Sequence, residues 1–433
     1  MIIGAVGRYL RRLRSFSPNA RLYLLSTVIT GVSFSIYMLI FNLYVDSQGY
    51  SRTFLGELQS LPNLIALFGA PPAGVLVDYI GRKRALLLAN VGRTVAYLGI
   101  VLAPDANVLR LSMITFGVAQ SLWMVSGAPF MMENSTDEER NALFSANFGL
   151  QTLVGFAGTL VGGYLPTLFG SMFGAGAESP TAYGFTMGVA VVLSVLALIP
   201  VFLIEGRSQP AELSVGSFLP WRNVSDLGLV ARIFVPNIVI SMGAAILIPY
   251  MNLFFKETYP ISDKLLGSIF AVSSIVTGVA TLSSPLLADR WGRIRSLVIT
   301  QLTSIPFLLL IGFSGVFWVS AASFWVRAAL MNMGNPLYSA FAMEQVPERE
   351  RATVSGLMGM SWNIGWTVGP YLSGYMQQHP SIGFKPIFLV TCSLYILASV
   401  LMRSFFQRLD DRQRRAAFLR EVGVTDMTQG GRT

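Results

Sequence analysis

Long apolar runs separated by short polar turns occupy most of the chain. A helix needs about 20 apolar residues to cross a bilayer, and the runs are close to that length. They lie near 22–45, 54–77, 85–103, 108–132, 142–167 and 182–204 in the first half, and near 230–255, 265–288, 296–313, 317–343, 352–376 and 386–404 in the second. The pattern therefore predicts an all-α membrane protein with twelve transmembrane helices.

The longest polar break, EGRSQPAELSVGSFLPWRNVSDLGL, lies at the midpoint of the chain. Its two prolines and several charges indicate a linker rather than a spanning helix. We expect a six-helix bundle with a basic leader over 1–204, a cytoplasmic linker over 205–229, a second six-helix bundle over 230–404, and a basic cytoplasmic tail over 405–433.

Basic residues set the expected orientation, because cytoplasmic loops are enriched in Lys and Arg. With the N-terminus inside and twelve crossings, about 24 of the 31 Lys and Arg residues fall in cytoplasmic segments. Only Arg52, Lys256, Lys264 and Lys385 fall in external loops. We therefore expect both termini in the cytoplasm, the tail as an amphipathic surface helix, and no cleavable signal peptide before the first span.

Composition narrows the possible partners. Of the 433 residues, 53% are hydrophobic and 12% are charged, whereas soluble proteins carry about 25% charged residues. The net charge of +9 comes from short clusters between apolar runs, which favours acidic lipid headgroups over nucleic acid. The single Cys392 excludes an intramolecular disulfide, and the single His379 excludes a histidine-based metal cluster or catalytic triad. We expect no metal, no cofactor and no nucleic-acid partner.

The two halves repeat each other. GVLVDYIGRKR at 74–84 returns as PLLADRWGRIR at 285–295, an offset of 211 residues. Such a repeat predicts two copies of a six-helix unit in the same orientation, an architecture that recurs in transporters. The same offset pairs Gly56 with Gly267, Asp78 with Asp289, Gly81 with Gly292, Arg82 with Arg293, Arg84 with Arg295, Glu133 with Glu344, Arg140 with Arg351, Gly163 with Gly374 and Tyr164 with Tyr375.

The repeated stretch resembles the cytoplasmic loop signature of the major facilitator superfamily, roughly G-x-x-x-D-x-x-G-R-[RK]-[RK]. The second copy departs from it at Pro285 and Ile294. PFMMENSTDEER and FAMEQVPERER resemble the family's turns after helices four and ten, and GFAGTLVGGYLP and GWTVGPYLSGY resemble its Gly-rich helices five and eleven. The resemblance covers residues 20–405 and is closest in pattern to the drug or metabolite:proton members with twelve helices. It implies a transporter that works by alternating access.

The repeated charges predict a conformational latch at the cytoplasmic side. Asp78 can face the N-terminus of helix eleven near Thr353 and Ser355, because a helix N-terminus favours an anion, and Asp289 can do the same for helix five near Asn141. Basic turns that act only as topology signals are the alternative interpretation. Tight turns at Gly81 and Gly292 and pairs of Arg82 with Glu133 and of Arg293 with Glu344 complete the latch, with Arg84, Arg140, Arg295 and Arg351 beside them.

Small residues predict close helix packing. Gly158 and Gly162 form a GxxxG motif, which Gly163 follows, and small residues let helices approach closely in lipid. We expect these glycines to pack helix five on helix eight, and Gly374 to pack helix eleven on helix two.

Substrate contacts are expected on helices one, four, seven and ten, which line the central cavity in the family. Helical spacing places polar and aromatic residues on shared faces there, although packing between helices is an alternative role for each of them. Among three span arginines, Arg327 is the best candidate for an anionic or polar substrate, with a structural ion pair as the alternative role, whereas Arg93 and Arg110 favour structural pairing or snorkelling. The candidates are Thr30, Ser33, Tyr37, Gln120, Trp123, Asn237, Ser241, Arg327, Asn335, Trp362 and Trp366.

These residues favour a secondary transporter in the cell membrane, acting as a monomer in a lipid bilayer. Weakly charged, aromatic helices favour efflux of an apolar or amphiphilic small molecule, with import of a polar or anionic metabolite and a non-transporting receptor or scaffold as alternatives. Helices one, four, seven and ten carry no carboxylate at mid-depth, so Asp78, Glu133, Glu344 or Glu57 would have to carry any coupled protons. An enzyme is disfavoured because no paired acids or nucleophile–base pair lie at matched depth.

Overall fold

The computed structural model describes residues 16–206, 225–379 and 383–421, and these residues form helices and turns without a strand. The all-α prediction is confirmed. The first half contains α2 (Pro18–Ser47), α3 (Arg52–Ile80), α4 (Arg82–Leu102), α5 (Ala106–Glu133), α6 (Asp137–Met172), α7 (Pro180–Leu196) and α8 (Leu198–Leu203). The second half contains α9 (Leu227–Leu247), η3 (Ile248–Tyr250), α10 (Met251–Thr258), α11 (Asp263–Trp291), α12 (Arg293–Phe313), α13 (Phe317–Glu344), η4 (Glu348–Glu350), α14 (Arg351–Gln377) and α15 (Lys385–Glu421).

Several helices of the first half begin at a residue whose side chain caps them. A capping side chain accepts a hydrogen bond from a backbone N–H that has no partner inside the helix. This local chemistry explains why the apolar runs start their helices where they do. The caps of α2, α3, α5, α6 and α7 are Ser17, Ser51, Asp105, Thr136 and Ser179.

Glycine makes the turns between α3 and α4 and between α11 and α12. Gly81 has a φ of 85° and Gly292 has a φ of 84°. A side chain at either position would strain the backbone in this left-handed region. The expectation that these turns need glycine is confirmed.

The seventh apolar run is interrupted. It forms α9, the short helix η3 and then α10, and Pro249 lies within η3. Proline has no N–H to donate within a helix, so it breaks the regular ladder. The apolar pattern alone does not predict this break.

Ten helices among the described residues are long and apolar enough to cross a membrane. The helices α13 and α14 are 28 and 27 residues long, but they are not among these ten. Helices occupy all twelve of the predicted ranges. The count of twelve crossings and the side on which each terminus lies stay predictions.

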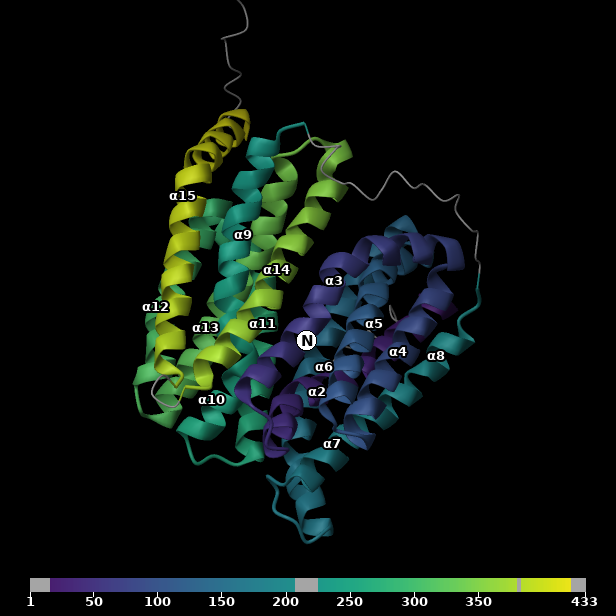
Figure 1. The fold of residues 1–433 in the computed structure, drawn as a ribbon. Helices are drawn as coiled ribbons and strands as arrows, with labels where there is room; N and C mark the ends of the chain where they lie inside the picture. Colours follow the sequence, from purple (N-terminus) through teal and green to yellow (C-terminus); the bar gives the residue numbers. More distant parts are fainter. Residues whose placement is uncertain (1–15, 207–224, 380–382, 422–433) are drawn as a thin grey trace, which may run out of the picture.

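The two halves form two bundles of helices that lie side by side (Figure 1). They meet where α3 packs along α14 and α6 packs along α11. The ribbons converge near α10 and diverge toward the end where α15 extends (Figure 1). Following the predicted orientation, we call the end with α10 the outer end, and the end with the Gly81 and Gly292 turns the cytoplasmic end.

Parts of the predicted leader, linker and tail fall outside the described residues. These are 1–15 of the leader, 207–224 of the linker and 422–433 of the tail. The described part of the tail belongs to α15, which runs without a break from Lys385 to Glu421. The described part of the tail therefore continues the last helix of the second bundle instead of starting a separate surface helix.

Candidate functional site

Ion pairs join the two halves at the outer end. Arg52 at the start of α3 pairs with Asp46 at 3.0 Å and with Glu257 of α10. Lys256 of α10 pairs with Glu178 of the first half and with Asp263 at 3.0 Å. Each cation thus contacts a carboxylate of the other half, which holds the outer ends of the bundles together.

Asp263 is the most deeply buried of these carboxylates. Its side chain is 1% exposed, compared with 63% for Glu178. The hydroxyl of Tyr183 on α7 donates to both carboxylate oxygens of Asp263 at 3.3 Å. A buried carboxylate needs such partners because desolvation of its charge is costly. Lys256 of α10 supplies the opposite charge, and Tyr183 of the first half supplies the hydrogen bonds.

Two asparagines join α2, the first predicted span, to α10, part of the seventh, just inside the ion pairs. The side-chain amide of Asn42 donates to Asn252 Oδ1 at 3.1 Å and to the Pro249 carbonyl at 2.5 Å. In return, Asn252 donates to the Leu39 carbonyl at 2.8 Å. Both side chains are buried. We call the following residues the outer seal: Asn42, Arg52, Glu178, Tyr183, Asn252, Lys256, Glu257 and Asp263.

Glycines bring the backbones of the two halves into contact at the same end. A Cβ at Gly163 of α6 would lie 2.6 Å from the Asp263 carbonyl oxygen and 2.8 Å from the Cα of Gly267 on α11. A Cβ at Gly374 of α14 would meet the Arg52 carbonyl and lie 3.2 Å from the Cα of Gly56 on α3. The structure thus contains the predicted contacts of helix five with helix eight and of helix eleven with helix two.

The GxxxG motif faces elsewhere. A Cβ at Gly158 would lie 2.6 Å from Ser35, and a Cβ at Gly162 would lie 3.4 Å from Ile36, both on α2. The expectation that these two glycines pack on helix eight is therefore wrong. They let α6 approach α2 closely within the first half.

The cytoplasmic ion pairs lie within each half. Arg82 pairs with Asp78 at 2.6 Å and with Glu133 at 3.4 Å, and Arg293 pairs with Glu344. The pairs of Arg82 with Glu133 and of Arg293 with Glu344 are the ones that the sequence predicts. Because both partners belong to one bundle, these bonds tie a loop to its own half and do not join the halves. The bonded partner of Asp78 is Arg82 rather than the start of helix eleven.

The remaining latch candidates are spread over the same end. Arg140 pairs with Asp137 of its own helix at 2.8 Å, and the Arg351 Nε donates to the Met343 carbonyl at 3.0 Å. Arg84 and Arg295 are exposed in the first turns of α4 and α12, and Asp289 lies in the last turn of α11. Arg140 and Arg351 therefore make local contacts and do not join the predicted clusters.

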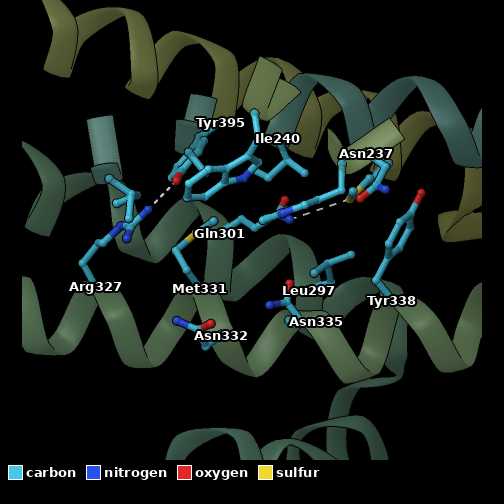
Figure 2. Close-up of a pocket in the computed structure, with 16 residues that line it drawn as sticks. Asn237, Ile240, Leu297, Gln301, Arg327, Met331, Asn332, Asn335, Tyr338 and Tyr395 are labelled. Atoms are coloured by element: carbon cyan, nitrogen blue, oxygen red, sulfur yellow. Dashed lines mark hydrogen bonds between the residues drawn. The ribbon is translucent and has the colours of Figure 1, made fainter. Parts of the chain in front are cut away.

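A cavity of ≈ 160 Å³ lies inside the second half (Figure 2). Helices α9, α12, α13, α14 and α15 supply its wall. Five of the predicted substrate residues lie in this wall: Asn237, Arg327, Asn335, Trp362 and Trp366. The sequence did not predict the contributions of α12 and α15, because the family resemblance pointed to helices one, four, seven and ten. Its other residues are Ile240, Ala244, Ile248, Leu297, Gln301, Met331, Asn332, Gly334, Tyr338, Tyr395 and Met402.

Arg327 is the charged group of this wall. The residue is 6% exposed, and its guanidinium donates to the hydroxyl of Tyr395 (Figure 2). Asn237 donates to the Met358 carbonyl at 3.0 Å and to the Ser361 hydroxyl. Gln301 accepts from the Ser399 hydroxyl at 2.9 Å. These contacts fix the polar groups in place before any ligand arrives.

Other substrate candidates make contacts between helices. Thr30 donates to Asn90 at 3.2 Å, Ser33 donates to the Ala190 carbonyl at 2.7 Å, and the Tyr37 hydroxyl contacts the Met113 sulfur at 3.5 Å. Ser241 contacts the Ser361 carbonyl at 3.3 Å. Thr30, Ser33, Tyr37 and Ser241 are buried in helix contacts and lie outside the wall of the second-half cavity.

Gln120 and Trp123 surround Arg93, which is 3% exposed. The Arg93 guanidinium contacts Gln120 at 3.5 Å and lies 5.3 Å from the centre of the Trp123 ring. Near the outer end, Arg110 forms two hydrogen bonds with Glu57, at 2.6 and 3.1 Å. Glu57, a predicted proton carrier, is therefore part of an ion pair.

Two bundles of long apolar helices, a sealed contact between them and a cavity inside one bundle are the architecture of a multi-pass membrane transporter. The chain belongs to the Major Facilitator Superfamily, whose family model matches residues 23–235 and 233–426. The predicted family is confirmed. The two matched stretches correspond to the two halves of the internal repeat.

Curated relatives cover nearly the whole chain. The multidrug resistance protein MdtG of Dickeya zeae is 24% identical over 405 residues, which cover 90% of this chain and 93% of that protein. The multi-drug resistance efflux pump PmrA homolog of Lactococcus lactis is 23% identical over 390 residues, covering 86% and 90%. The solved nucleoside transporter NupG has a TM-score of 0.74 at 13% identity and covers 90% of this chain and 99% of its own. At this identity, the likeness to NupG shows the fold alone.

Proposed function

We propose that the chain exports small amphiphilic solutes across the cell membrane by alternating access, as a monomer with both termini in the cytoplasm. The observation that carries the proposal is the outer seal. Ion pairs, an asparagine pair and backbone contacts join the halves at the outer end, whereas the cytoplasmic ion pairs stay within each half. This asymmetry is what an inward-facing state of a two-state transporter requires.

Efflux is the favoured direction. The relatives that match most of this chain are named as multidrug resistance and multidrug efflux proteins. The cavity wall agrees with an amphiphilic solute, because it combines aromatic and aliphatic side chains with a few polar groups, as ligand sites usually do.

The cytoplasmic charges would act in the opposite state. When the outer seal opens, the cytoplasmic ends of the bundles must approach each other. The carboxylate of Asp78 can then accept hydrogen bonds from the N–H groups at the start of α14 in place of part of its contact with Arg82. Asp289 can likewise accept hydrogen bonds from the N–H groups at the start of α6. The ion pairs of Arg82 with Glu133 and of Arg293 with Glu344, each within one half, would hold the two loops in position for these new hydrogen bonds. This is the latch that the repeated motif predicts.

Protons are the proposed coupling ion. Asp78, Glu133 and Glu344 are half-exposed at 48%, 54% and 48% and lie at the cytoplasmic end, so protons bound to them can be released to the cytoplasm. Protonation of Asp78 would remove its attraction to Arg82 and to a helix N-terminus alike. Such a step would link proton uptake to opening of the cytoplasmic side.

Proteoliposomes test the proposal directly. Purified protein is reconstituted, a pH gradient is imposed, and movement of ethidium, rhodamine 6G and Hoechst 33342 is followed by fluorescence. We expect gradient-driven movement of at least one dye, loss of movement in Asp78→Asn, and normal movement in Arg403→Gln, which removes an exposed charge on α15. Binding of a dye without movement would favour a non-transporting receptor and refute export.

A further inference from the structure

The cavity of the second half contains a buried positive charge without an acidic counterpart in its wall. Arg327 is 6% exposed, and the lining residues include no Asp or Glu. The bonded neighbour of its guanidinium is the neutral hydroxyl of Tyr395. A buried charge that lacks an opposite charge costs free energy, which a bound anion would offset.

Two hydrogen-bond donors of the wall have no acceptor. The buried Nε of Arg327 and the buried indole Nε1 of Trp366 have no hydrogen-bond partner in the structure. A buried donor without an acceptor is unfavourable, and native proteins rarely contain one. Both donors belong to residues of the same cavity wall. A ligand with acceptor oxygens, such as a carboxylate, would bring hydrogen-bond acceptors to this wall.

Aromatic side chains form the rest of the recognition surface. The rings of Trp362 and Trp366 lie 6.2 Å apart with an interplanar angle of 31°, and Tyr338 and Tyr395 also line the cavity (Figure 2). An apolar cavity of about 150 Å³ in a protein core binds benzene. The cavity here measures ≈ 160 Å³, so a single aromatic ring matches its size.

The first half offers no equivalent charge. The repeat offset of 211 residues places Phe116 opposite Arg327, and Phe116 packs against Tyr37 at 5.4 Å in an aromatic cluster. The charge at position 327 is therefore not part of the internal repeat. A purely structural charge shared by the repeat would occur in both halves.

We propose that this cavity is a binding site for a monocyclic aromatic carboxylate, with the carboxylate beside Arg327 and Trp366 and the ring against Trp362. The proposal rests on the proposed export function, because it names the class of solute that the transporter carries. The bound charge would replace the missing acidic partner. The ring would cover the apolar part of the wall.

Calorimetric titration of purified protein with benzoate and benzamide at pH 7 tests the site without transport. The two probes have the same ring and nearly the same size, but benzoate carries a charge. Charge-assisted hydrogen bonds contribute enough for benzoate to bind roughly ten- to a hundredfold more tightly than benzamide. Equal binding, or tighter binding of benzamide, by the wild-type protein would overturn the proposal, even if no variant can be purified.

Three variants test whether the preference for benzoate over benzamide depends on Arg327. Arg327→Gln should remove the preference for benzoate, and Arg327→Lys should keep part of it, because lysine retains the charge without the planar fork. Arg232→Gln, which removes an exposed charge from α9 of the same half, should keep the full preference. A folded Arg327→Gln variant with an unchanged preference would refute the assignment. Selective benzoate binding without gradient-driven movement of benzoate or of any dye would refute the export function and leave the site intact.

Discussion

Gly163→Ala should open the outer end of the protein. The new Cβ would lie 2.6 Å from the Asp263 carbonyl oxygen, whereas ordinary van der Waals contact begins at 3.4 Å. Helices α6 and α11 must therefore separate by roughly 0.8 Å, because both contacting groups near this position are backbone and a packed interior yields little. A gap of about 0.5–1 Å already forfeits a quarter to a half of the dispersion attraction between the helices.

The expected magnitude follows from overpacking. Adding a methyl group to a well-packed contact costs about 1–3 kcal/mol, and this cost applies only to the state in which α6 and α11 touch. The helix propensity of alanine, which favours it over glycine by about 1 kcal/mol, applies to both states and cancels. The sealed state should therefore lose roughly 5- to 150-fold in population relative to the open state.

Electron–electron double resonance can measure this shift. Spin labels at Ala103→Cys and Val316→Cys, in a Cys392→Ala background, report the distance between exposed positions at the outer ends of the two halves. We expect a longer distance population in Gly163→Ala. Gly188→Ala is the matched control, because a Cβ there would meet no atom within 4 Å. An unchanged distance distribution in Gly163→Ala, or an equal change in the control, would refute the close-contact reasoning.

Three further substitutions probe other contacts, each followed by thermal unfolding of the purified protein. Asn252→Ala should destabilise it by about 1–3 kcal/mol, because Asn42 loses a buried partner; an unchanged unfolding temperature would show that the asparagine pair contributes nothing. Gly292→Ala should cost about 1–2 kcal/mol because φ is 84° there, whereas Gly356→Ala in α14, where a Cβ meets open space, should not destabilise; equal effects would argue against strain. Hydrogen bonds from the Ser225 hydroxyl and backbone N–H lower the pKa of Glu350, which lies in the turn before α14. Its contribution should be fully present above the ordinary Glu pKa of about 4.3 and be lost as the pH falls through the lowered value. Glu350→Gln should therefore be less stable than wild type at pH 7, and the difference should shrink as the pH falls below about 4.3; a pH-independent difference would contradict this.

The sequence predicted the features that depend on local pattern or on the repeat. The Gly81 and Gly292 turns, the pairs of Arg82 with Glu133 and of Arg293 with Glu344, and the helix ranges all follow from residues at fixed spacing. The repeat also pointed to Gly163 and Gly374 as contact positions. These features were accessible because each is encoded within a few residues or copied at one offset.

Features that depend on helix rotation and on contacts between distant segments were not predicted. Adjacent helical residues point about 100° apart, so Gly162 contacts α2 while its neighbour Gly163 contacts α11. The outer seal joins pairs such as Tyr183 and Asp263, which no local pattern connects. A signal did exist for Asn42 and Asn252: they are polar residues in apolar runs, separated by 210 residues, one fewer than the repeat offset.

The glycine contacts at the outer end have the geometry of a twofold-symmetric dimer. Helix five of each half packs on helix two of the other, through Gly163 with Gly267 and Gly374 with Gly56. In a true homodimer each mutation would appear on both sides of such an isologous contact. Fusion into one chain removes that constraint, so one half can keep Phe116 in an aromatic core while the other holds Arg327 beside a cavity. A symmetric contact can thus join two different interiors, and chemical specificity can change in one half without altering the contact between the halves.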